Sequence, residues 1–187
     1  MKTLLVSGSP AANSHTHALL VCIAEALESK GHSYEIWDLG EKPLPISQPS
    51  WHTNPLNADV QAVCDFYGAV QGADAVVLGT PNYHGSYSGV IKNALDCLTG
   101  DALANKPVGV VSHGSNVRKS HQPCLHLTTV VMTMKGTPML TQIGTDKTDY
   151  DVSLGHLKLK NSDCIERCNI LANELELWVG RMDDKAS

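Results

Sequence analysis

Five short apolar runs alternate with stretches of helical periodicity along this chain of 187 residues. The runs have the length and β-branched content of buried strands, and the stretches repeat apolar residues as amphipathic helices do. Such alternation predicts an α/β fold with a parallel sheet covered on both faces, which right-handed crossovers make doubly wound. The expected strands are Thr3–Ser7, Tyr34–Leu39, Ala75–Gly79, Pro107–Ser112 and Thr137–Ile143, and the expected helices are His17–Lys30, Asp59–Gln71, Val90–Leu98, Gln122–Lys135 and Ser162–Val179.

The remaining stretches suggest one domain with two long connections. The length suits a single core, so residues 1–187 are expected to form one unit. Glu41–Asn57 is rich in Pro, Ser and Asn, which predicts a long surface loop. Gly144–Lys160 has no clear periodicity and is expected to be irregular and mobile, and Met182–Ser187 is expected to be a tail.

The composition narrows the class of protein. A formal net charge of -5 argues against a nucleic-acid binder, which usually carries a basic face. No apolar run approaches the roughly 20 residues that a membrane helix needs, and no signal-peptide pattern precedes the first strand. The six cysteines are scattered, so the chain is expected to be a reduced cytoplasmic protein with no disulfide framework and no membrane contact.

The loop within Thr80–Asp96 joins the third strand to the third helix and has an unusual composition. Pro81 cannot donate to a strand ladder and ends the strand, while Gly85 permits positive φ and the close approach of a flat group. Tyr83 and His84 offer ring faces with polar tips. Ligands of open α/β sheets bind at the carboxyl ends of the strands, so this loop predicts a ligand site. The alternative is a loop whose glycines only make turns.

The loop Gly8–Thr16 follows the first strand and opens the first helix. The amides at a helix start lack partners and carry partial positive charge, so they bind anions. Ser9, Ser14 and Thr16 add hydroxyl donors, and His15 adds a ring nitrogen. Neither a P-loop nor a G-x-G-x-x-G fingerprint is present, so the loop suits a single phosphate. The alternative is that Ser14 only caps the helix.

Together these loops resemble the NAD(P)H-dependent FMN reductase family. The resemblance rests on Ser7-Gly8-Ser9-Pro10 with Ser14-x-Thr16, on the whole of Thr80–Asp96, and on Gly109–Ser115 as a third loop. It covers about Lys2 to Ile143 and implies a flavodoxin-like fold with a five-stranded sheet. The motif style is most similar to the flavin reductases of two-component monooxygenase systems, and related quinone and azo reductases share the motifs.

The resemblance implies that the chain binds FMN and uses NADPH or NADH as co-substrate. Many family members have Arg where this chain has Ala11, and His15 is expected to replace part of that charge, so FMN is expected to dissociate easily. The implied FMN-binding residues are Ser9, Ser14, His15 and Thr16 at the phosphate, Pro81, Asn82, Tyr83, His84 and Gly85 along the isoalloxazine, and Ser112, Gly114 and Ser115 on its other side.

Three functions remain open at this point. The first is an oxidoreductase that passes electrons from NAD(P)H to free flavin, a quinone or a similar small acceptor. The second is a flavodoxin-like electron carrier, and the third is a flavin-binding protein without turnover. The first is favoured, because carriers are usually more acidic than a net charge of -5. The loops hold no carboxylate pair or Cys–His pair, so no catalytic side chain is named and a ping-pong mechanism is expected.

The sequence also suggests what the chain assembles with. Apolar residues near Trp51 and along Val90–Leu98 are expected to be exposed and to form a homodimer or homotetramer, and the family resemblance points the same way. A monooxygenase is an expected partner on the resemblance alone. Four close residues, His113, His121, Cys124 and His126, lack the spacing of a structural zinc site, so no metal is expected.

Overall fold

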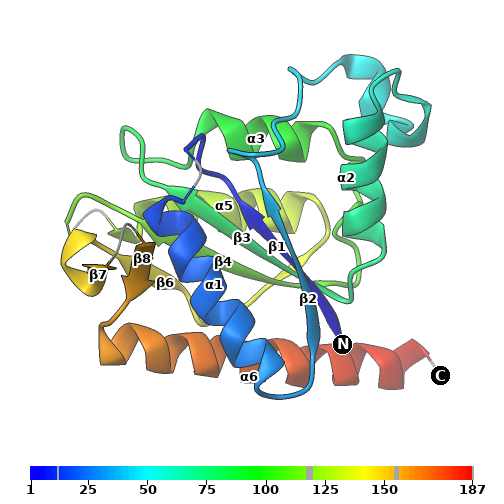
Figure 1. Ribbon diagram of the computed structural model, residues 1–187. Coiled ribbons are helices and arrows are strands. Elements are labelled where there is room, and N and C mark those ends of the chain that lie inside the picture. The colour runs from blue at the N-terminus through cyan, green and yellow to red at the C-terminus, as the bar shows by residue number, and fades with distance from the viewer. Residues whose placement is uncertain (12, 117–119, 154–155, 187) are drawn as a thin grey trace.

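The computed structural model describes residues 1–11, 13–116, 120–153 and 156–186. A parallel sheet with the strand order β2-β1-β3-β4-β5 forms its centre, and β6 also pairs with β4 (Figure 1). This order confirms the predicted flavodoxin-like, doubly wound fold. The strands are β1 (Lys2–Ser7), β2 (Ser33–Asp38), β3 (Ala75–Pro81), β4 (Pro107–His113), β5 (Thr137–Pro138) and β6 (Ile143–Thr145).

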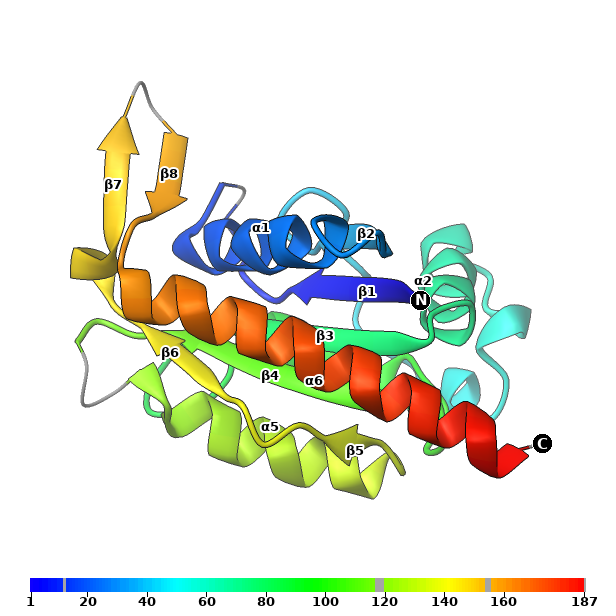
Figure 2. The ribbon, with the colours of Figure 1, turned by 90° about the horizontal axis from the view of Figure 1, so that it is seen from below.

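Helices cover both faces of the sheet, as the alternating pattern predicts (Figures 1 and 2). On one face lie α1 (His15–Glu28) and α6 (Ser162–Ala186), and on the other lie α2 (Gln61–Gln71), α3 (Gly89–Asp96) and α5 (Gln122–Thr133). Side chains alternate along each strand, so Leu4 and Val6 face α3 while Leu5 faces α1. In the described parts of the chain, no helix is long and apolar enough to cross a bilayer.

The last expected strand, Thr137–Ile143, is two short pieces in the structure. Both β5 and β6 pair with β4, at its two ends. Between them, the amides of Leu140 and Thr141 bond to the Glu174 carboxylate of α6, at 2.8 and 3.0 Å, instead of continuing the ladder. The prediction of one continuous strand was therefore wrong, because a side chain competes for the backbone donors.

Part of the stretch Gly144–Lys160 is regular, so the prediction of an irregular segment was wrong. It holds a short 3-10 turn, η3 (Lys147–Asp149), and then β7 (Tyr150–Ser153) and β8 (His156–Leu159), which pair antiparallel. Residues 154 and 155, between these strands, lie outside the described residues. Figure 2 shows the two strands projecting beyond the start of α1. The expected tail is also helical up to Ala186, because α6 continues through it.

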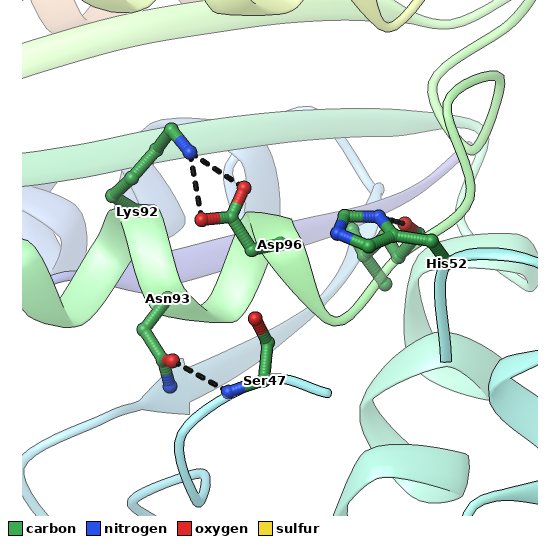
Figure 3. A network of polar contacts seen from close by, with 6 residues as sticks. Ser47, His52, Lys92, Asn93 and Asp96 are labelled. Atoms are coloured by element: carbon green, nitrogen blue, oxygen red, sulfur yellow. Dashed lines mark hydrogen bonds and ion pairs between the residues drawn. The ribbon is translucent and has the colours of Figure 1, made fainter. Parts of the chain in front are cut away.

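The long loop Glu41–Asn57 contains two 3-10 turns, η1 (Pro49–His52) and η2 (Pro55–Asn57), and packs against α3. Asn93 of α3 accepts a hydrogen bond from the Ser47 amide at 2.9 Å, and the His52 ring nitrogen lies 3.3 Å from the Leu98 carbonyl (Figure 3). Trp51 is only 3% exposed. The expectation of exposed apolar residues in this loop was wrong for Trp51, which packs in a small core cluster with Val63 and Cys97. It was right for Ile46 and Leu56, which are 82% and 61% exposed.

Candidate functional site

Three loops leave the same edge of the sheet, at the carboxyl ends of β1, β3 and β4. Backbone hydrogen bonds hold them together there: the Gly8 amide donates to Gly79 and the Asn82 amide donates to His113, each at 2.7 Å. In the sheet, β2 lies beside β1 on one side and β3 lies beside β1 on the other, so the order of the strands reverses at β1. This point of reversal is where open α/β sheets bind their ligands.

The first loop presents hydrogen-bond donors to a single region. The Ser9 Oγ accepts from the Ala11 amide at 3.2 Å, and the Ser14 Oγ accepts from the His17 amide at 3.1 Å, so both hydroxyl hydrogens stay available to an anion. The amides of His15 and Thr16 find no acceptor among the residues that the structure describes. Residue 12 of this loop lies outside the described residues. These donors at the start of α1 suit a phosphomonoester.

The second loop is a tight two-residue turn. Tyr83 and Ser86 exchange backbone hydrogen bonds of 2.9 and 3.1 Å, and both residues between them have positive φ, 54° at His84 and 82° at Gly85. This is the geometry of a type I′ hairpin turn, in which glycine is favoured. The side chains of Tyr83 and His84 are exposed, so this turn presents backbone and ring surface to solvent.

Two side chains of α5 support the second loop. Gln122 Oε1 accepts from the Asn82 side-chain amide at 3.3 Å, and the His126 ring nitrogen lies 2.9 Å from Ser86 Oγ. The Tyr87 ring also meets His126 edge-on, with 6.4 Å between the ring centroids. The sequence alone did not point to Gln122, and it suggested His126 only as a candidate metal ligand. Their spacing of one helical turn at the start of α5 was the available signal.

Ser88, the N-cap of α3, ties the second loop to the first. Its hydroxyl donates to the Gly8 carbonyl and accepts from the Ile91 amide at 3.2 Å. Gly8 packs so closely here that a Cβ on it would lie 2.7 Å from the Ile91 Cβ and 2.8 Å from the Gly79 carbonyl. The motif Ser-Gly-Ser therefore has a steric reason for its glycine, and the two loops have a fixed spacing.

The third loop contributes one inward-facing side chain and one exposed residue. The Ser112 hydroxyl is engaged inside the fold, where it donates to the Ser120 carbonyl and lies 3.2 Å from the Cys124 sulfur. The Gly114 amide donates to Thr145 at 2.8 Å, and Ser115 is exposed. A contact from Ser112 to a ligand would therefore come from its backbone.

The third loop also meets the first through a pair of imidazoles. The rings of His15 and His113 stack with centroids 4.3 Å apart and planes inclined by 9°. Burial lowers the pKa of His15, and burial together with the neighbouring His15 lowers the pKa of His113 to about 4. Both shifts favour the neutral imidazoles in the protein without a ligand. Among the described residues, no group of three or more His, Cys, Asp or Glu side chains is arranged to hold a metal ion.

The residues present fit the two parts of FMN. The start of α1 offers unpaired amides and hydroxyl hydrogens for a phosphate, and the tight turn at His84 and Gly85 offers a flat backbone surface for a ring system. The structure brings together the expected residues of the first, second and third loops, with the Ser112 hydroxyl turned inward. The individual contacts to the flavin stay predictions.

Comparisons with known proteins bear on the family of the whole chain. Residues 1–149 match the family described as NADPH-dependent FMN reductase. The chain is 40% identical over 180 residues to the FMN-dependent NADPH-azoreductase of Staphylococcus aureus (strain USA300). The aligned region covers 96% of this chain and 95% of that protein.

Solved structures share the fold at low sequence identity. An NADH:FMN oxidoreductase (EMOB) has a TM-score of 0.73 at 21% identity, covering 94% of this chain and 88% of its own. FerB of Paracoccus denitrificans, a flavoenzyme NAD(P)H:(acceptor) oxidoreductase, has a TM-score of 0.76 at 18% identity, covering 97% and 98%. The predictions of an enzyme, of FMN as cofactor and of NAD(P)H as electron donor are confirmed, and the chain belongs to the NADPH-dependent FMN reductase family.

Proposed function

We propose that this chain transfers electrons from NADPH to a small planar acceptor, such as free flavin, a quinone or an azo compound, by a ping-pong mechanism. The observation that carries the proposal is the 40% identity to an FMN-dependent NADPH-azoreductase over 96% of the chain. The exposed ring of Tyr83, with 46% of its surface accessible, supports it, because an acceptor needs an open face beside the flavin.

The three loops divide the work of holding the cofactor. We assign the FMN phosphate to Ser9, Ser14, Thr16 and the backbone amide of His15. Pro81, Asn82, Tyr83, His84 and Gly85 would hold the isoalloxazine on one side, and Gly114 and Ser115 would hold it on the other. The absence of the family's arginine at Ala11 leaves helix-end and hydroxyl contacts as the donors among these residues, each worth on the order of 1 kcal/mol.

The protein acts mainly by positioning. FMN, when bound, would supply the redox chemistry between the nicotinamide and the acceptor. The tight turn at His84 and Gly85 fixes the backbone that faces the ring, and Ser88 fixes its distance from the first loop. Orientation of the reactants alone supplies a large share of the barrier reduction in such reactions. The described loops contain no carboxylate pair that would act as general acid and base.

Steady-state and anaerobic kinetics test this function. Initial rates with varied NADPH and varied quinone are expected to give parallel double-reciprocal lines, and NADPH without air is expected to bleach the yellow protein. Intersecting lines would contradict the ping-pong scheme. A protein that neither NADPH nor NADH bleaches would instead be an electron carrier or a non-catalytic flavin binder.

His84→Ala is expected to lower turnover modestly. Complete loss of reduction with FMN still bound would show that a proton donor is required.

We further propose a homodimer or homotetramer. The helix α5 exposes Leu125 and Met132, which are 63% and 55% accessible and lie two turns apart on one face. Next to them, a groove of about 220 Å³ runs between α3 and α5 and is lined in part by Leu95 and Val130. A monooxygenase partner and a cytoplasmic location stay predictions from the sequence.

A further inference from the structure

Four side chains from four segments meet between the first and the third loop. They are His15 at the start of α1, His113 at the end of β4, Thr145 at the end of β6 and Tyr150 at the start of β7, and we call them the histidine–tyrosine cluster. The Tyr150 ring stands edge-on to both stacked imidazoles, with centroids 4.8 Å from His15 and 5.6 Å from His113. The cluster therefore links a loop assigned to the FMN phosphate with the hairpin that follows the sheet.

The Tyr150 hydroxyl fixes the start of α1 directly. It donates to the His15 carbonyl at 3.1 Å and lies 2.8 Å from Thr145 Oγ1, which in turn lies 3.3 Å from the His113 ring nitrogen. Tyr150 is only 5% exposed, and burial raises the pKa of its hydroxyl far above the usual value. It therefore remains a neutral donor at every working pH and holds the backbone that carries the unpaired amides.

The stacked imidazoles are close enough to affect each other's protonation. Each ring disfavours a proton on the other, and burial disfavours both protons in the free protein. An anion at the start of α1 would reverse this for His15, because a neighbouring negative charge favours the charged imidazole. The titratable groups around the cluster are Asp146 and Asp149 on the hairpin side, His17 on α1, and Cys164 and Cys168 on α6.

We propose that Tyr150 is a positioning residue of the phosphate loop, and that it holds His15 against His113 so that this pair takes up one proton when the FMN phosphate binds. The proposal rests on the proposed function. The proton comes from solvent and stays on an imidazole nitrogen, and no bond to the flavin forms or breaks. The first loop has no charged side chain, because Ala11 stands where many family members have Arg. Proton uptake by the imidazoles would supply part of that positive charge when the ligand is bound.

Proton linkage predicts how the affinity depends on pH. Because the phosphate raises the pKa of His15 in the complex, FMN binds more weakly as the pH rises through the interval between the free and the bound pKa. The measurement belongs between about pH 7 and pH 8.5, where a phosphomonoester has already lost its second proton. Riboflavin has the same ring system without the phosphate, so its affinity should not change in this range.

The test uses the full chain freed of flavin, titrated with FMN and with riboflavin. Calorimetry in two buffers of different protonation enthalpy counts the protons taken up. The unmutated protein is expected to take up protons with FMN, approaching one per chain towards the lower end of this pH range, and none with riboflavin. His15→Gln is expected to remove this uptake. Tyr150→Phe keeps the ring and loses the hydroxyl, so it should lower the preference for FMN over riboflavin about fivefold, the equivalent of one hydrogen bond. Tyr34→Phe, at the exposed start of β2, is the matched control and should change neither quantity.

The outcomes separate this inference from the function on which it rests. Equal affinity of the unmutated protein for FMN and riboflavin would overturn the phosphate site and the inference together. A clear preference for FMN without proton uptake would overturn the inference alone. So would a Tyr150→Phe variant that loses affinity for both flavins equally. If that variant does not fold, the proton count on the unmutated protein still decides.

Discussion

At the scale of single residues, Ser14 combines a structural and a functional role. Its Oγ caps α1 by accepting a hydrogen bond from the His17 amide at 3.1 Å. This bond does not use the hydroxyl hydrogen, which can therefore be donated to a phosphate. Ser14→Ala should lower the free energy of unfolding by about 1 kcal/mol through the lost cap. It should also weaken FMN about fivefold relative to riboflavin. Fluorescence titration with both flavins measures the second effect. Ser29→Ala, at the other end of the same helix, is the control, and an unchanged ratio in Ser14→Ala would remove Ser14 from the phosphate site.

Gly85 is a second residue whose identity the backbone dictates. Its φ of 82° lies in the left-handed region, and its amide donates to Asn82 Oδ1 at 2.9 Å. A β-branched side chain there costs roughly 1–2 kcal/mol of backbone strain. Gly85→Val should therefore distort the turn and abolish flavin binding, as seen by loss of bound yellow flavin on desalting. Gly180→Val, in an exposed turn of α6 with open space around it, should keep the flavin. Retention of flavin by Gly85→Val would mean that the ring does not lie along this turn.

At the scale of elements, α5 acts as a brace for the second loop. Gln122 and His126 reach the Asn82 amide and the Ser86 hydroxyl from adjacent turns of the helix. Replacing both by alanine removes two partly exposed hydrogen bonds, so affinity for the flavin ring should fall about threefold to tenfold. The loss should be the same for FMN and riboflavin, unlike that of Ser14→Ala. Thr129→Ala, on the exposed side of α5, serves as control. A selective loss of FMN affinity would place the phosphate near α5 and contradict the assignment.

At the scale of the whole molecule, the exposed face of α5 predicts association. Sedimentation at micromolar concentration should show a species of at least twice the 20.1 kDa chain mass. Leu125→Glu together with Met132→Glu places two charges on the proposed contact and should shift the protein towards the monomer. Leu177→Glu, an exposed position on α6, should leave the assembly intact. A 20.1 kDa species from the unmutated protein would contradict the proposal.

The sequence could predict the features that follow from long apolar runs, but not those that depend on packing between distant segments. The layered sheet was predictable because β1, β3 and β4 are continuous apolar runs, and the first two loops because each begins where such a run ends. The β7–β8 hairpin was not, because four-residue strands such as Tyr150–Ser153 are too short to show a period. The spacing of Gln122 and His126 indicates that they share one face of α5, but it does not indicate which loop that face contacts, because this depends on how α5 packs. The orientation of the Ser112 hydroxyl was also not predictable, because the hydroxyl points inward to bond the Ser120 carbonyl.

The hydrogen bond from Tyr150 to the His15 carbonyl joins residues that are 135 positions apart in the chain. A chain emerging from the ribosome completes the first two loops long before it reaches this tyrosine. A domain generally folds as a unit once its segments are available. Until Tyr150 has been added, the start of α1 lacks this tether, so selective binding of the FMN phosphate has to wait until most of the protein has been synthesised.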